Sequence, residues 1–91
     1  SDVDFNGFKI DNFISDKSIY INITTLLYRK NAEELKKKLS SIEKVDIVKI
    51  MINGISNYKI IIGPFEDLLK LNQVLKNDTI QEYEDLSIFL K

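Results

Sequence analysis

The segment Tyr58 to Phe65, YKIIIGPF, constrains the fold of this chain more than any other part of the sequence. Its three consecutive isoleucines predict a buried strand, which runs from Tyr58 to Ile62. Gly63 and Pro64 are expected to end that strand, because proline cannot donate a hydrogen bond to a ladder and glycine permits a sharp turn. Phe65 is then expected to turn back beneath the sheet.

A second apolar run, Val45 to Asn53, directly precedes this strand. Gly54 lies in the short connection, where it can supply a positive φ at no steric cost. Because the connection is so short, the two strands must be antiparallel.

A further strand and a helix are predicted upstream. Residues Tyr20 to Leu26, YINITTL, alternate and are rich in β-branched residues, as in a strand. A helix then begins between Arg29 and Asn31, with Asn31 and Glu34 as a capping box. Its apolar residues recur at helical spacing, and they are Ala32, Leu35, Leu39 and Ile42.

The C-terminal part predicts one more helix and one more strand. Asp67 is a suitable N-cap, and Leu68, Leu71 and Leu75 form an apolar stripe behind it. Asn77 and Asp78 end this helix. A last strand is predicted over residues 85–91, DLSIFLK.

The resulting order, β-α-β-β-α-β, predicts an α+β, ferredoxin-like fold over residues 19–91. Right-handed crossovers place both helices on one face of a four-stranded antiparallel sheet with strand order 4-1-3-2. The other face is open to solvent. Residues 1–18 form either a linker or an extra segment packed on the domain, with Asn6-Gly7 as a hairpin turn between Phe5 and Phe8.

Alternation along each strand assigns side chains to the two faces of the sheet. The predicted helix-facing residues are Ile21, Ile23, Val48, Ile50, Ile52, Ile60, Ile62, Leu86 and Ile88. The predicted open-face residues are Tyr20, Asn22, Thr24, Lys49, Met51, Lys59, Ile61, Ser87 and Phe89.

Composition narrows the possible chemistry. The chain has no Cys and no His, so thiol nucleophiles, histidine acid–base chemistry and zinc sites of the usual kind are not expected. We predict no enzyme activity, no cofactor and no metal. The net charge of −1 argues against a nucleic-acid partner, and no apolar run approaches the roughly 20 residues that cross a bilayer.

Three parts of the sequence resemble the SPOR domain, a sporulation-related bacterial repeat. Tyr20 to Leu26 is similar to the family's first strand, and Tyr58 to Phe65, with its Gly-Pro-Phe ending, is similar to its third. Ala32 falls where the family's first helix carries Ala. Ile61, in contrast, stands where the family usually has a second Arg.

The resemblance implies binding of peptidoglycan, especially glycan strands without stem peptides, by the open sheet face. It implies a place in the bacterial periplasm or cell envelope, at the division septum, within a longer parent that is membrane-anchored, secreted or a lipoprotein. This segment itself is expected to make no membrane contact. The predicted glycan-binding residues are Tyr20, Asn22, Thr24, Met51, Lys59, Ile61, Ser87 and Phe89.

The alternative is a protein-interaction module on the same fold. Met51, Ile61 and Phe89 would make the open face unusually apolar, and such patches often mark binding sites. The partner would then be another envelope protein.

Overall fold

The computed structural model describes residues 4–5, 8–9 and 17–91. Its elements in chain order are β1 (Asp4–Phe5), β2 (Phe8–Lys9), β3 (Ile19–Leu26), α2 (Arg29–Leu39), β4 (Val45–Ile52), β5 (Ile55–Phe65), α3 (Leu68–Leu75), α4 (Asp78–Gln81) and β6 (Ser87–Leu90).

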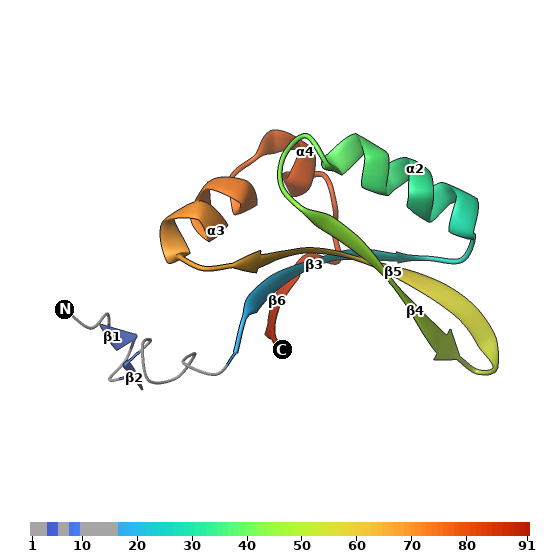
Figure 1. Cartoon of the computed structure of the whole chain (residues 1–91), viewed down its shortest axis with the longest axis horizontal. Helices are drawn as coiled ribbons and strands as arrows, with labels where there is room; N and C mark the ends of the chain where they lie inside the picture. The colour runs from blue at the N-terminus through green and yellow to red at the C-terminus, as the bar shows by residue number, and fades with distance from the viewer. Residues whose placement is uncertain (1–3, 6–7, 10–16) are drawn as a thin grey trace.

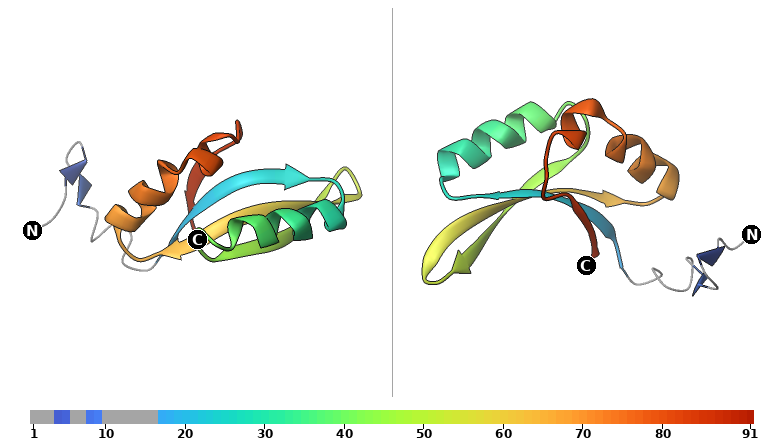
Figure 2. Two further views of the ribbon diagram at one scale, coloured as in Figure 1. Left: turned by 90° about the horizontal axis from the view of Figure 1, so that it is seen from above. Right: turned by 180° about the vertical axis from the view of Figure 1, so that it is seen from behind.

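Four of the strands form one antiparallel sheet in the order β4-β5-β3-β6. Numbered along the domain, this is the predicted order 4-1-3-2, so the ferredoxin-like α+β fold is confirmed. The helices lie together on one side of the sheet, and no element of residues 17–91 covers the other side (Figure 1). The reverse view in Figure 2 shows the same two layers. No helix in the described part of the chain is long and apolar enough to cross a membrane.

The core lies between the sheet and the helices. Isoleucines of β3 and β5 meet apolar residues of the helices there, and burial of this surface is the main source of stability. The buried cluster consists of Ile19, Ile21, Ile23, Ala32, Leu39, Val45, Ile60, Ile62, Phe65, Leu71, Val74 and Ile80.

The strand β5 is longer than the sequence predicts. Gly63 and Pro64 do not end it, because pairing with β3 continues to Phe65. Ile21 pairs with Ile62 and Ile19 pairs with Phe65, so two steps along β3 correspond to three along β5. The extra residue is a bulge, which bends a strand without ending it. Phe65 is buried in the core, as expected.

The helix ends follow the sequence only in part. α3 begins as predicted, with Oδ1 of Asp67 accepting a hydrogen bond from the N–H of Lys70 at 2.7 Å. For α2 the predicted capping box is wrong, because Tyr28 is the N-cap and makes no side-chain bond. The short helix α4 was not predicted; Oδ1 of Asn77 caps it by accepting from the N–H of Thr79 at 2.9 Å.

The predicted faces of β4 are wrong by one residue. Val45 and Ile47 pair with the buried Ile62 and Ile60, and therefore face the helices. Side chains alternate along a strand. Two sets of predictions are reversed: Lys49 and Met51 lie on the helix side, and Val48, Ile50 and Ile52 lie on the open side.

The predictions for residues 1–18 are tested only at a few positions. β1 and β2 pair antiparallel, with Phe5 opposite Phe8, while Asn6 and Gly7 lie outside the described residues. Ser18 and Lys91 exchange two backbone hydrogen bonds of 3.0 Å, which bring these two ends of the domain side by side. The domain boundary after residue 18 stays a prediction.

Candidate functional site

Two aromatic rings lie against each other on the open face, the side of the sheet without helices. Tyr20 on β3 and Phe89 on β6 are direct cross-strand partners. Their ring centroids are 5.4 Å apart and their planes differ by 18°, which is a stacked arrangement. Both side chains are half-buried, so the pair presents part of its apolar surface to solvent.

Two lysines approach these rings. Nζ of Lys59 lies 4.6 Å from the centroid of Phe89, and Nζ of Lys91 lies 5.4 Å from that of Tyr20. Both distances are within the range of cation–π attraction. Because β3 separates β5 from β6, the Lys59 side chain must extend across β3 to reach Phe89. The rings and the two cations therefore form one connected group, Lys59–Phe89–Tyr20–Lys91.

A polar pair lies beside the rings. Asn22 and Ser87 are cross-strand partners, and Nδ2 of Asn22 donates to Oγ of Ser87 at 3.4 Å. Oδ1 of Asn22 is inaccessible to solvent and has no hydrogen-bond partner within the described residues. Buried polar atoms without partners are uncommon and call for an explanation.

Ile61 occupies the centre of the open face. It pairs with Asn22 on one side and with Asp46 on the other. Despite its place on the uncovered side of the sheet, it is only 2% exposed. Ile61 therefore forms the floor of the site and offers little surface of its own to a ligand.

The structure brings together most, but not all, of the predicted site residues. Tyr20, Asn22, Lys59, Ser87 and Phe89 form one surface above Ile61. The two residues that lie elsewhere are Thr24 and Met51.

The face predicted for Thr24 is wrong because β3 contains a bulge. The register shifts between Asn22 and Thr24, so Thr24 pairs with the buried Ile60. Thr25, one residue later, pairs with Lys59 and takes the open-face position. A bulge reverses the alternation beyond it.

Met51 lies at the far end of the β4–β5 hairpin and on the helix side of the sheet. It pairs with Ser56, whose Oγ donates to its Sδ at 3.4 Å. The Met51 side chain is 62% exposed, because in Figure 1 the joined ends of β4 and β5 turn away from α2. It does not belong to the open-face group.

Besides Thr25 and the open-side residues of β4 named above, sequence reasoning missed Lys91 and Asp46 on this face. Alternation from Ser87 through Phe89 would have placed Lys91 on the open face. Asp46 pairs with Ile61, and only the correct β4 register reveals this.

The comparisons with known proteins agree with this architecture. The chain is similar to the crystal structure of the RlpA SPOR domain from Pseudomonas aeruginosa, with a TM-score of 0.68 and 18% sequence identity. The match covers 78% of this chain and 96% of that one. The resemblance to a SPOR domain is therefore confirmed for the fold. No protein-family model and no curated protein matches the chain.

Proposed function

We propose that the open face binds peptidoglycan glycan strands that lack stem peptides, as a non-catalytic module of a bacterial envelope protein. The observation that carries the proposal is the half-buried Tyr20–Phe89 stack on the uncovered face of a SPOR fold. A pyranose ring has an apolar face of C–H groups, and a flat aromatic surface is suited to cover it. Because a lysine lies over the outer face of each ring, the proposal has a sugar ring displace one of these ammonium groups and pack on the aromatic face that it leaves.

The neighbouring polar groups suit the rest of an amino sugar. Ser87, which accepts a hydrogen bond from Asn22, is exposed, and its hydroxyl can form a hydrogen bond with a sugar hydroxyl or an acetamide group. Lys59 and Lys91 supply positive charge over the rings of Phe89 and Tyr20. A muramic acid residue without its stem peptide has a free carboxylate, and an ammonium group attracts such a group. The proposed targeting to the septum and envelope follows from this preference.

The experiment is a co-sedimentation assay with peptidoglycan sacculi. Purified domain is mixed with intact sacculi and with sacculi whose stem peptides an amidase has removed. We expect retention on the stripped form. Phe89→Ala and Asn22→Ala should each lower the affinity about tenfold, which corresponds to about 1.4 kcal/mol.

A charge-matched control separates the site from general electrostatics. Lys59→Ala should weaken retention, whereas Lys76→Ala, which removes an exposed lysine at the end of α3, should not. Equal loss in both variants would mean that net charge alone drives retention. Retention on neither form of peptidoglycan would refute the proposed function while leaving the fold intact.

Protein binding is a second candidate function, favoured by the end of the β4–β5 hairpin. Met51, Ile52 and Ile55 are 62%, 45% and 57% exposed there. The open face is a weaker candidate for this role than the sequence suggests, since Ile61 is buried and Met51 lies on the other side. Sedimentation velocity over a range of concentrations tests the idea. Self-association that Ile55→Ser abolishes would support it, and a monomer at all concentrations would exclude self-association through this surface.

A further inference from the structure

A pocket of about 320 Å³ lies between α2 and the β4–β5 hairpin, on the helix side of the sheet. Of its lining, only Asp46, on the edge strand β4, belongs to the open face. Three of its residues share one side of α2, at spacings of four and three. The full lining is Arg29, Glu33, Lys36, Asp46, Ile47, Lys49 and Tyr58.

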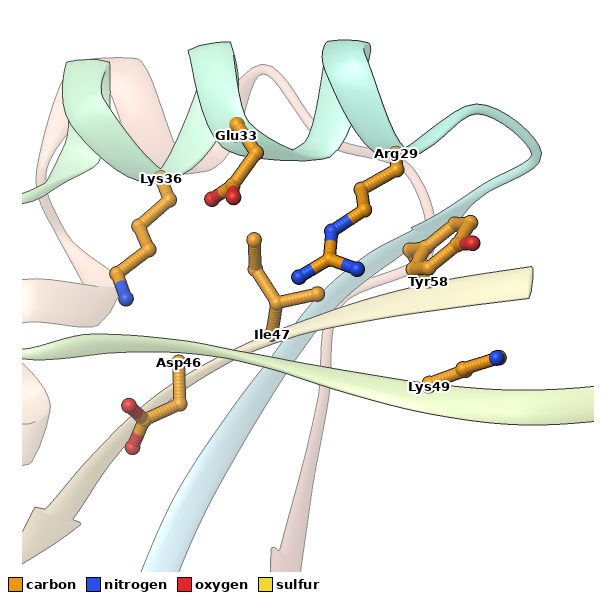
Figure 3. A pocket seen from close by; sticks show the side chains of 7 residues that line it. All are labelled: Arg29, Glu33, Lys36, Asp46, Ile47, Lys49 and Tyr58. Carbon is orange, nitrogen blue, oxygen red and sulfur yellow. The ribbon is translucent and has the colours of Figure 1, made fainter. Parts of the chain in front are cut away.

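Three cationic and two acidic side chains line this pocket, which gives the lining a net positive charge. Figure 3 shows Arg29 and Lys36 reaching from α2 toward the sheet, with Glu33 between them. Asp46 also lines the pocket, with its side chain directed to the other side of β4 from Ile47, and Lys49 extends along the strand. Among the described residues, no acid lies within 4.0 Å of the charged nitrogens of Arg29, Lys36 or Lys49. The cations are therefore not neutralised by ion pairs within that part of the chain.

The floor of the pocket is apolar. Ile47 rises from β4 beneath the guanidinium of Arg29, and the ring of Tyr58 lies beside it (Figure 3). Both side chains pack against the core and remain partly exposed. Their position is therefore held by the fold, and they offer apolar surface directly next to the cations.

We propose that this pocket binds an organic carboxylate, with the carboxylate held by Arg29, the charge of Lys36 adding to the attraction from beyond Glu33, and the apolar body resting on Ile47 and Tyr58. A guanidinium presents its N–H groups in a fork that matches the two oxygens of a carboxylate. Glu33 lies between the two cations, so it disfavours a dianion such as phosphate more than a monoanion. This site goes beyond the proposed glycan function, because it uses the opposite side of the sheet and none of the same residues.

The ligand class that combines these features is the carboxyl terminus of a peptide ending in an apolar residue. Capture of a terminal carboxylate by a few N–H donors is a recurring mode of peptide recognition. A volume of about 320 Å³ is near the lower end for ligand pockets, which suits one terminal residue better than a long segment.

The test uses a matched pair of ligands, N-acetyl-Gly-Gly-Leu with a free carboxylate and the same peptide as its C-terminal amide. Each is titrated into the ¹⁵N-labelled domain at constant ionic strength, and amide chemical shifts are followed. We expect the acid to shift the amides around Arg29, Ile47 and Tyr58 in a saturable manner. The amide should leave them unchanged.

Two variants with a matched control complete the experiment. Arg29→Gln should weaken binding of the acid about ten- to a hundredfold, as expected for loss of a charged hydrogen-bond donor. Lys36→Gln should act in the same direction. Lys37→Gln removes the same charge one residue further along α2 without touching the pocket, and should have no effect.

Several results would overturn the proposal. They are equal shifts with acid and amide, shifts centred on the open face, or undiminished binding after Arg29→Gln. All three variants change exposed or half-exposed positions, and unchanged spectra away from α2 would verify that they are folded. Sacculus binding is measured in parallel with the same variants. The pocket contains none of the residues of the proposed glycan site. Either proposal can therefore fail without the other.

Discussion

Gly63 on β5 lies directly against the ring of Tyr20 on β3. A Cβ atom at Gly63 would be 2.9 Å from Cδ2 of Tyr20 and 2.9 Å from the backbone oxygen of Ile19. The φ angle of Gly63 is +139°, which residues with a side chain rarely adopt. The Gly-Pro-Phe ending of β5 therefore does more than bend the strand. Its glycine leaves the space that the ring of Tyr20 occupies.

Replacing Gly63 by alanine should be much more harmful than the same change at Gly54. Gly63→Ala introduces a backbone clash and a strained φ, and such strain costs of the order of 1–3 kcal/mol before the clash is counted. Gly54 also has a positive φ, +79°, but a Cβ atom there would meet nothing within 4 Å beyond its chain neighbours. Urea unfolding of both variants measures the difference. Equal losses of stability would mean that the contact with Tyr20 and Ile19 is unimportant.

The stacked rings should be energetically coupled. A double-mutant cycle with Tyr20→Ala, Phe89→Ala and the double variant should give a coupling free energy of about 0.5–1.5 kcal/mol. The free energy of unfolding is the quantity to measure. A cycle of Tyr20→Ala with Ile55→Ala, at the remote hairpin end, should be additive and serves as the control. Additive losses in the first cycle would contradict a stabilising stack.

Two isoleucines of β4 distinguish the observed faces of this strand from the predicted ones. Ile47 packs against the core, whereas Ile50 pairs with Asn57 on the open side. Because Ile47 is only partly buried, Ile47→Ala should cost about 1–3 kcal/mol, below the usual upper range for core truncation. Ile50→Ala should cost less than about 1 kcal/mol. Thermal or urea unfolding measures the loss of stability in each variant. A larger loss for Ile50→Ala than for Ile47→Ala would support the faces of β4 that the sequence predicts.

The helix caps offer a similar pair. Asp67→Ala removes the 2.7 Å hydrogen bond to the N–H of Lys70 and should cost about 0.5–2 kcal/mol, as for other N-caps. Asn31→Ala should be nearly neutral, because α2 begins at Arg29 and Tyr28 is its N-cap. Unfolding midpoints at constant m-value test this. A cost at Asn31 similar to that at Asp67 would indicate that Asn31 caps the helix in solution.

The topology could be predicted because several independent signals agree. β3 and β5 are β-branched, the helices have clear apolar stripes, and the connection at Gly54 is short. Each signal is local, and the right-handed crossover rule then fixes the strand order. Tyr20, Asn22, Lys59, Ser87 and Phe89 follow from simple alternation and lie together in the structure.

The wrong face assignments arose in strands where the alternation of apolar and polar residues does not decide which side faces the helices. β4 is apolar at both odd and even positions, and α2 covers only part of it, so its pattern carries no clear preference for one face. The bulge in β3 exchanges the sheet faces on which Thr24 and Thr25 lie. Threonine is common in regular strands, so neither residue type indicates a bulge. The burial of Ile61 depends on side chains from neighbouring strands, which no single strand's pattern contains.

The paired backbone bonds of Ser18 and Lys91 determine how the domain responds to mechanical load. Ladder hydrogen bonds between antiparallel strands run across the strands. A stretching force between these two residues therefore acts along the hydrogen bonds and falls on the terminal pair alone. The hydrogen bonds between β3 and β6 would therefore break one pair after another, starting at this end. In a shear geometry, by contrast, they would carry the force together. The edge that carries Phe89 and Ser87 would separate from Tyr20 and Asn22 first, so tension across the domain would dismantle the open-face site before the core.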